Sequence, residues 1–446
     1  MQQIDGTTEF GLGASDAAVT SVPVRRRALL SSFLGWMFDG YETSTLILVG
    51  FSAMTSLMHG ASRSSMQLAV GTAMSSTLLG WAIGGMIGSV MADYIGRKRM
   101  LTIAIAGYSI FTGLTAFSAT PEALIVLRFL TGLFLGSEWS TGTALVAETW
   151  PASKRAKALG IMQSGYGFGF LLASLTWLVA LPLLGQDAWR WMFVLGVLPA
   201  IVLLFVRRSM PESEMWKASR RARTDRASQS SIERLRTAKD NFTLFMMLRD
   251  RTSRRNVFCT LIMTTVTVAV FYGTSTIFYP MVSSIATRHG LDPQNWATIA
   301  AIAFNVGSLA GYISAGFIAE AYGRKKYMAL TFLGGLITTP LAFILSNSIE
   351  TAMIASLVLG FFTLGSFSWL PIYLPELFPT AVRATASGFV FNFGRLLAFP
   401  LPAYAASMAA SRGDPLLPAF LIAALLVLSL LVLRVLPETK GQGLPE

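Results

Sequence analysis

The sequence predicts an all-α membrane protein in which twelve transmembrane helices form two pseudo-symmetric six-helix bundles. Hydrophobic residues make up 53% of the 446 residues, charged residues only 13%, and the mean hydropathy is +0.57. A soluble globular chain carries about 25% charged residues. Apolar windows of about 20 residues, long enough to cross roughly 30 Å of hydrocarbon, recur along the chain. Two charged motifs occur once in each half.

The first repeated motif is a basic run that follows an apolar window. Residues 93–99 (DYIGRKR) are matched by residues 320–326 (EAYGRKK). The second motif is an acid followed by a proline and an arginine, and it occurs as Glu148, Pro151 and Arg155 and again as Glu376, Pro379 and Arg383. The copies are offset by about 228 residues, and such internal duplication is common in secondary transporters.

The predicted spans follow the apolar windows in order. The first comes directly after Arg25–Arg27 and is too long for the apolar core of a signal peptide, so we expect a retained helix. Glycines in the second and fourth spans, such as Gly84 and Gly132, are expected to let helix backbones approach closely in lipid. The spans are 28–50, 68–92, 100–119, 122–147, 158–180, 190–206, 257–281, 296–319, 327–346, 351–375, 385–408 and 416–436.

Residues 28–206 and 257–436 are therefore predicted to be the two bundles. The segment 207–256, rich in Arg and Ser, is predicted to be a linker with short interfacial helices around 231–250. Its basic residues are expected to set topology first, with contact to anionic lipid or regulation as the alternative. The remaining residues, 1–27 and 437–446, are expected to be terminal tails.

The charge distribution predicts which side of the membrane each loop faces. A formal net charge of +12 would favour nucleic-acid binding in a soluble chain, yet most of the 35 Lys and Arg residues lie in alternate loops and in the linker. The opposite loops hold only Arg63, Arg190, Arg288 and Arg412. By the positive-inside rule, the linker and both termini are predicted to be cytoplasmic in a bacterial inner membrane, and no nucleic acid is expected as a partner.

Several kinds of enzyme site are absent from the sequence. Cys259 is the only cysteine, and His59 and His289 are the only histidines, so a disulfide framework, a Cys-based metal site or a histidine cluster is excluded. No phosphate-binding loop of the form G-x4-GK[ST] and no nucleophile elbow occurs. The sequence thus predicts neither an enzyme nor a cofactor, and it gives no support for ATP-driven transport.

The run from Gly88 to Arg99 resembles the loop signature of the major facilitator superfamily. The resemblance implies a transporter that rocks between two states. An acid at a helix end beside a basic cluster can lock two helices in one state, with topology and helix-end stabilisation as the alternative role. The candidate gating residues are Asp93, Gly96, Arg97, Arg99, Glu148, Arg155, Glu320, Arg324, Glu376 and Arg383.

Other runs resemble proton symporters for organic acids. Residues 38–42 (FDGYE) are similar to a motif of the aromatic-acid and sialate proton symporters, with Glu42 in place of the usual second Asp. Parts of residues 136–166 resemble the sialate symporter family, which includes lactate and pyruvate carriers. Gly394 and Arg395 are similar to the aromatic-acid symporters.

A competing resemblance points to sugar porters. Residues 211–213 and 437–441 are similar to segments of that family, but they lie in predicted cytoplasmic segments. The seventh span reads FYGTST at 271–276 and lacks the paired glutamines that we expect for hexose hydroxyls. Sugar transport is therefore kept as an alternative.

The predicted spans contain few charges. An ionised side chain at the bilayer centre costs roughly 2.5 to 3.5 kcal/mol on insertion scales, so it lies mostly in a cavity or beside a partner. An arginine can hold a carboxylate in a two-pronged geometry, and a desolvated acid can exchange a proton near neutral pH. Coupled transport of an anion and protons would need both kinds of group, and the spans supply Asp39, Glu42, Arg128, Glu138 and Arg395.

Asp39 is predicted to be the principal proton-coupling residue, with a helix-packing hydrogen bond as the alternative. Glu42 lies one helical turn away, so the two carboxylates are expected to share a proton. Glu138 is the third proton-coupling candidate. Arg395, near the middle of its span, is predicted to bind the substrate, whereas Arg128 is either a second substrate contact or a structural pair with an acid such as Asp39.

Uncharged polar and aromatic residues are the remaining candidates for the substrate site. For each of them a helix–helix hydrogen bond or a core position is the alternative. They are Gln163, Tyr166, Tyr272, Asn305, Trp369, Tyr373 and Asn392.

Together these features predict proton-coupled uptake of a small organic carboxylate, such as a monocarboxylate, an aromatic acid or a sialate, by alternating access. The alternatives are a proton-coupled sugar porter, a drug/proton antiporter and a non-transporting membrane sensor of a solute. The expected partners are the organic anion, protons and membrane lipid, and the protein is expected to be a monomer.

Overall fold

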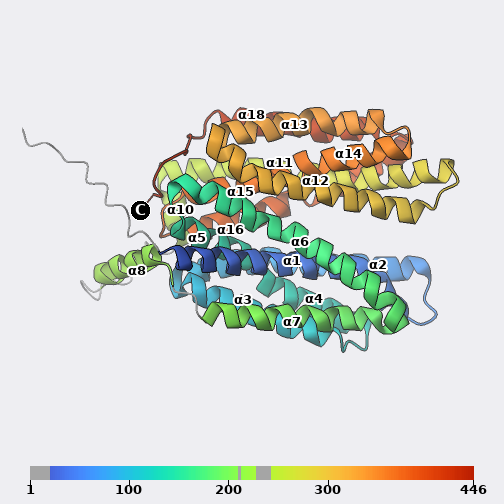
Figure 1. Ribbon diagram of the computed structural model, residues 1–446, viewed down its shortest axis with the longest axis horizontal. Helices are drawn as coiled ribbons and strands as arrows, with labels where there is room; N and C mark the ends of the chain where they lie inside the picture. Colours follow the sequence, from blue (N-terminus) through green and yellow to red (C-terminus); the bar gives the residue numbers. More distant parts are fainter. Residues whose placement is uncertain (1–20, 209–211, 228–242, 446) are drawn as a thin grey trace, which may run out of the picture.

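The computed structural model describes residues 21–208, 212–227 and 243–445, and within these ranges all regular structure is helical. Figure 1 shows two helical halves that lie alongside each other along the long axis of the molecule. The C-terminus, α8 (Glu214–Ala227) and α10 (Thr243–Arg249) lie together on the left of Figure 1. We call this end of the molecule the linker end and the opposite end the far end.

The first half consists of six helical rods. The fourth rod contains two helices, because α4 ends at Gly136 and α5 continues beyond it. The helices are α1 (Val22–Leu57), α2 (Arg63–Ile95), α3 (Arg97–Thr115), α4 (Pro121–Leu135), α5 (Glu138–Thr149), α6 (Ala152–Leu184) and α7 (Ala188–Arg208).

The second half repeats this arrangement. Its fourth rod is again broken, here by the 3₁₀ turn η2 (Gly365–Ser368), and its fifth rod restarts at Pro400, a residue that suits the first turn of a helix. The helices are α11 (Arg251–Arg288), α12 (Pro293–Tyr322), α13 (Arg324–Leu345), α14 (Ile349–Phe362), α15 (Trp369–Leu377), α16 (Arg383–Ala398), α17 (Pro400–Arg412) and α18 (Leu416–Leu433).

Eight of these rods are long and apolar enough to cross a membrane, judged by length and composition. They are the rods formed by α2, α4–α5, α6, α11, α12, α13, α14–α15 and α18. Together with α1, α3, α7 and α16–α17, they make twelve rods in two sets of six within the described residues.

α11 begins inside the segment predicted to be the linker. Asp250 caps its first turn by accepting a hydrogen bond from the backbone N–H of Ser253 at 2.7 Å. The helix therefore starts before the predicted span 257–281. Its first residues include several arginines, which lower the local hydropathy and so fall outside the apolar window. α10 lies within the region where short linker helices are predicted, whereas 228–242 lie outside the described residues.

α2 and α4 pack backbone against backbone. A Cβ atom at Gly84 would lie 1.8 Å from the carbonyl oxygen of Leu133, and one at Gly132 would lie 2.2 Å from that of Thr77. Only glycine allows two helices to approach this closely. The close approach predicted for these two glycines is confirmed.

The two halves contact each other through α2 with α16 and through α6 with α12. A Cβ atom at Gly316 of α12 would lie 2.5 Å from the carbonyl oxygen of Ala156, and one at Gly388 of α16 would lie 1.8 Å from Oγ of Ser89. These glycines lie toward the linker end of their helices, so the halves are in tight contact there.

Candidate functional site

Each half carries an ion-pair cluster at the linker end. In the first half, Arg97 lies 2.8 Å from Asp93 and 3.0 Å from Glu148. In the second half, Arg324 donates to both carboxylate oxygens of Glu376 at 2.9 and 3.0 Å. All five side chains are buried, where charges are stable only when they are paired. The repeated sequence motifs thus form two matching clusters.

Two further ion pairs join the halves. Arg383 of the second half lies 3.0 Å from Glu148 of the first, and Arg155 of the first lies 3.5 Å from Glu376 of the second. Asp93 of the first half also accepts hydrogen bonds from Thr385 of the second, at 2.9 Å from the N–H and 2.7 Å from the hydroxyl. The linker end is therefore closed by bonds between the halves.

Gly96 turns the chain sharply between α2 and α3, and Gly323 does the same before α13. Their φ angles are +106° and +100°, in the region that favours glycine. A carboxylate caps the helix that follows each turn: Glu212 accepts from the N–H of Arg97 at 3.0 Å, and Glu438 accepts from the N–H of Arg324 at 2.9 Å. An acid at a helix N-terminus is favourable because it faces the positive end of the helix dipole.

Glu212 and Glu438 belong to the segments that resemble sugar porters. Burial alone would raise the pKa of Glu438, but hydrogen bonds from backbone N–H groups, including that of Arg324, outweigh it and hold this pKa below its usual value. The residues that follow the two acids complete the clusters, since Ser213 donates to Glu148 and Thr439 donates to Glu376, each at 2.5 Å. The sequence signal for these caps is the recurrence of Pro-Glu-Ser or Pro-Glu-Thr after the last span of each half.

Two of the candidate gating residues take less part in this network. Arg99 is exposed and forms no ion pair with any residue in the described ranges. Glu320, the counterpart of Asp93, is half-buried and interacts electrostatically with Arg324 and Lys157. The network at the linker end is thus less symmetric than the two motifs suggest.

Arg128 forms its ion pair with Glu42. The same buried guanidinium donates to the hydroxyls of Thr115 and Thr131, at 2.6 and 3.0 Å, and lies 4.7 Å from the ring of Phe193. The acid in this ion pair is Glu42, which lies one turn further along α1 than Asp39. All these contacts lie within the first half, so the structure shows Arg128 as a structural pair, and a substrate contact of Arg128 stays a prediction.

Asp39 and Glu138 are both buried in the first half. Asp39 on α1 lies close enough to Tyr166 on α6 to interact with it electrostatically. Glu42 is paired with Arg128, and a proton shared between Glu42 and Asp39 stays a prediction. Glu138 lies in the first turn of α5, directly after the break in the fourth rod, where the positive end of a helix dipole favours a carboxylate.

Arg395 lies on α16 with its guanidinium against two aromatic rings. Its Cζ atom lies 4.5 Å from the ring centroid of Trp81 and 4.1 Å from that of Phe391. Its Nε and Nη1 atoms are buried and have no hydrogen-bond partner among the described residues. Asn392, on the same face of α16, also has a buried Oδ1 atom without such a partner in these ranges. Unpaired polar atoms of two predicted site residues thus lie together.

Aromatic side chains from both halves surround this position. Trp36 packs against Tyr166 at 4.9 Å between ring centroids, and against Trp81 at 6.2 Å. Trp139 packs against Phe391 at 4.2 Å. We call these five residues, Trp36, Trp81, Trp139, Tyr166 and Phe391, the aromatic wall. Only Tyr166 among them is predicted from the sequence as a site residue, because a Trp or Phe in an apolar span cannot be told from a core residue.

The other predicted site residues on α6, α11 and α12 lie near the aromatic wall. Tyr272 and Arg395 both lie close enough to Tyr166 to interact with it electrostatically. Gln163 accepts a hydrogen bond from the indole N–H of Trp139 at 3.0 Å. Asn305 faces α6, with its Oδ1 atom 3.5 Å from where a Cβ of Gly167 would lie. Tyr312 of α12, which sequence reasoning missed, interacts with Gln163, Tyr166 and Tyr272.

Trp369 and Tyr373 lie in other surroundings. The indole N–H of Trp369 donates to the hydroxyl of Thr267 at 3.2 Å, inside the second half. The hydroxyl of Tyr373 donates to the carbonyl of Pro437 at the linker end. The structure therefore brings neither residue to Arg395, and Tyr373 belongs with the contacts around Glu438.

Two repeated six-rod halves, a guanidinium at their contact and ion pairs that close one end define a membrane transporter of the major facilitator fold and not an enzyme. Residues 28–446 match the family model described as "Sugar (and other) transporter". The chain belongs to this transporter family.

Known proteins similar to this chain support the same class. A probable 4-methylmuconolactone transporter of Cupriavidus pinatubonensis is 29% identical over 375 residues, which cover 84% of this chain and 81% of that protein. A gallate transporter of Pseudomonas putida is 30% identical over 383 residues, which cover 82% of each chain. The solved structure of the proton:xylose symporter XylE bound to 6-bromo-6-deoxy-D-glucose aligns with a TM-score of 0.76 and 21% identity, over 95% of this chain and 98% of that one. The predicted fold class is confirmed.

Proposed function

We propose that this protein moves a small organic carboxylate together with protons across a bacterial inner membrane by alternating access. The observation that carries the proposal is the Arg395 guanidinium, whose buried Nε and Nη1 atoms lack a hydrogen-bond partner among the described residues. Buried guanidinium N–H groups without an acceptor are costly, although the Arg395 side chain as a whole is half-buried. A carboxylate would supply the charge and a two-pronged acceptor that matches the guanidinium.

The aromatic wall favours a carboxylate that carries a ring. Planar rings pack against Trp, Tyr and Phe side chains in offset or edge-on arrangements. Trp81 and Phe391 already flank Arg395, so a ring attached to the bound carboxylate would extend along these surfaces. The similarity to transporters described for 4-methylmuconolactone and gallate supports this substrate class.

The acids of the first half are the proposed proton carriers. Asp39 is the principal candidate because it is fully buried and lies, like Arg395, in the electrostatic neighbourhood of Tyr166. Protonation of Asp39 would then change the electrostatic potential at the proposed substrate site. Glu42 is a second candidate, since a proton on its carboxylate would break the pair with Arg128, and Glu138 is a third.

The linker end is proposed to face the cytoplasm, because the basic loops and the linker gather there. The structure would then represent the state that is closed toward the cytoplasm. Entry of substrate from the far end, opening of the ion pairs and release into the cytoplasm would complete uptake.

Thermal unfolding of the purified protein in the presence of single solutes tests the proposal. A ligand that binds only the folded protein raises its unfolding temperature. Gallate, benzoate and nicotinate are expected to stabilise the protein more than lactate or pyruvate, and xylose is expected to have no effect. Stabilisation by xylose alone would replace the carboxylate with a sugar, and stabilisation by hydrophobic cations alone would indicate drug export.

Arg395→Lys sharpens this test because it keeps the charge and removes the fork. We expect at least a tenfold weaker affinity for the carboxylate, about 1.4 kcal/mol. Arg412→Lys, on an exposed arginine at the end of α17, is the matched control and should bind normally. Normal affinity and uptake in the Arg395→Lys protein would remove Arg395 from the substrate site.

A further inference from the structure

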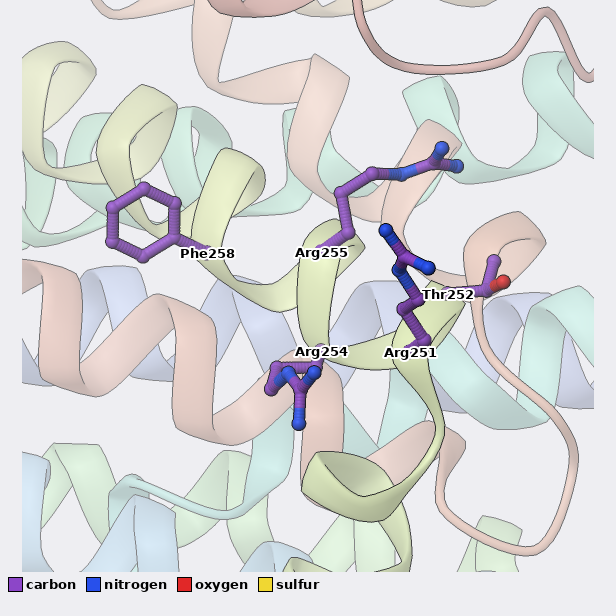
Figure 2. Close-up of a pocket in the computed structure, with 5 residues that line it drawn as sticks. All are labelled: Arg251, Thr252, Arg254, Arg255 and Phe258. Carbon is purple, nitrogen blue, oxygen red and sulfur yellow. The ribbon is translucent and has the colours of Figure 1, made fainter.

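A basic depression lies at the start of α11, away from the aromatic wall. Figure 2 shows its five lining residues, Arg251, Thr252, Arg254, Arg255 and Phe258, all from the first eight residues of this helix. Its volume is about 680 Å³. The depression lies at the linker end, next to α10.

The three arginines of this depression are exposed, and none forms an ion pair with an acid in the described parts of the chain. The nearest acid in sequence, Asp250, holds the backbone N–H of Ser253 at 2.7 Å as the helix cap. The backbone N–H groups of this terminus are thus already served by the cap, and what the depression offers a ligand is its guanidinium groups.

The position of these arginines is electrostatically unfavourable. A helix N-terminus carries a partial positive charge, so cations in the first turn destabilise it. Arg251 and Arg255 are also four residues apart, where like charges repel each other along a helix. In Figure 2 their side chains extend in the same general direction. An anion between them would relieve both effects.

Phe258 shows what kind of anion suits the depression. It follows Arg251 and Arg255 at helical spacing, so it extends the same face of α11 toward the membrane-spanning part of the helix. Its side chain is 65% exposed, although α11 as a whole is a membrane-spanning rod. Basic groups followed by an exposed aromatic ring match the order of a phospholipid from headgroup to acyl chain.

We propose that the depression binds an anionic glycerophospholipid, with its phosphate held by Arg251 and Arg255, flanked by Arg254, and its acyl chain against Phe258. A soluble anion would use the guanidinium groups but gain nothing from an exposed ring on the membrane side. The proposed lipid neutralises the start of α11, which is a helix of the second half joined to the linker.

Lipid retention by the intact protein, measured by native mass spectrometry with phosphatidylglycerol and phosphatidylcholine, tests the site. The unmodified protein should retain one phosphatidylglycerol in preference to phosphatidylcholine. Arg251→Gln/Arg255→Gln should lower this retention by about fivefold for each arginine removed. The control, Lys154→Gln/Lys326→Gln, removes the same charge from exposed positions at the same end and should retain the lipid.

Three further measurements keep the proposal testable if the double variant does not insert correctly. Phe258→Ala keeps every charge and should weaken retention, whereas Arg251→Lys/Arg255→Lys should largely preserve it. Inorganic phosphate at millimolar concentration should not displace the lipid. Equal loss of retention in Lys154→Gln/Lys326→Gln would overturn the lipid site. So would the absence of a preference for phosphatidylglycerol, or displacement by phosphate with no effect of Phe258→Ala.

Discussion

Arg383 of the second half and Arg97 of the first donate to the same carboxylate oxygen, Oε1 of Glu148, each at 3.0 Å. Glu148 is therefore held once from within its own half and once from the opposite half. When the halves separate at the linker end, Glu148 loses Arg383 but keeps Arg97 and the hydroxyl of Ser213. The bond between the halves can thus open without leaving a buried carboxylate unpaired, which suits a reversible gate.

Arg383→Gln should shift the protein toward opening at the linker end. Loss of a buried charge-assisted bond costs about 1.5 to 3 kcal/mol, which favours the separated state by tenfold or more. Distances between spin labels placed on the linker ends of the two halves, measured by electron paramagnetic resonance, should show a larger long-distance population. Arg412→Gln at the far end is the control, and an unchanged distance distribution in Arg383→Gln would show that this pair does not close the gate.

Arg128→Gln should destabilise the first half strongly because it leaves Glu42 as a buried charge without its ion-pair partner. The expected cost is about 3 to 5 kcal/mol in the free energy of unfolding. Glu42→Gln/Arg128→Gln removes both charges and should recover a large part of that loss, which a double-mutant cycle measures. Simple addition of the two single effects would mean that the pair contributes little coupling energy.

Asp39→Asn should separate binding from energy coupling. The substitution keeps the size and hydrogen-bonding capacity of the side chain and removes its proton exchange. Substrate binding and counterflow should persist, whereas accumulation driven by an inward proton gradient should be lost. If the Asn variant still accumulates substrate, and collapse of the proton gradient still stops it, the coupling proton resides elsewhere, and Glu42→Gln and Glu138→Gln are then the variants to compare.

Gly84→Ala should destabilise the contact between α2 and α4, because its methyl group would overlap the carbonyl oxygen of Leu133. Overpacking of this kind costs about 1 to 3 kcal/mol. Gly71→Ala in the same helix is the matched control, since a Cβ there meets nothing within 4 Å, and alanine is the better helix former. Thermal unfolding temperatures should fall for the first variant and stay level or rise for the second.

Glu438 should make stability depend on pH in the acid range. Its pKa in the folded protein lies below the usual value, so the ionised carboxylate stabilises the folded state above the unfolded pKa of about 4.3, and this contribution is lost as the pH falls through the folded pKa. Glu438→Gln should remove this part of the acid destabilisation while leaving other groups unchanged. Parallel curves of unfolding temperature against pH for the two proteins would contradict this role.

Much of the architecture follows from composition and spacing along the chain. Apolar windows must become helices in a bilayer, because hydrocarbon offers no partner for backbone N–H and C=O groups. Each window is a local property, and so is a repeated motif such as 93–99 and 320–326. For this reason the all-helical fold and its two halves could be predicted without coordinates, and Arg395 could be singled out as a charge within a span.

The partners of the charged residues could not be predicted in the same way. Which acid faces Arg128 depends on the rotation of α1 against α4, and a shift of one turn exchanges Asp39 for Glu42. The crossed bonds of Arg383 and Arg155, and the aromatic wall around Arg395, depend on how the two halves dock. Helix rotation and docking are set by side-chain packing over the whole molecule, in which a Trp that lines a site and a Trp that fills a core have the same local sequence signal.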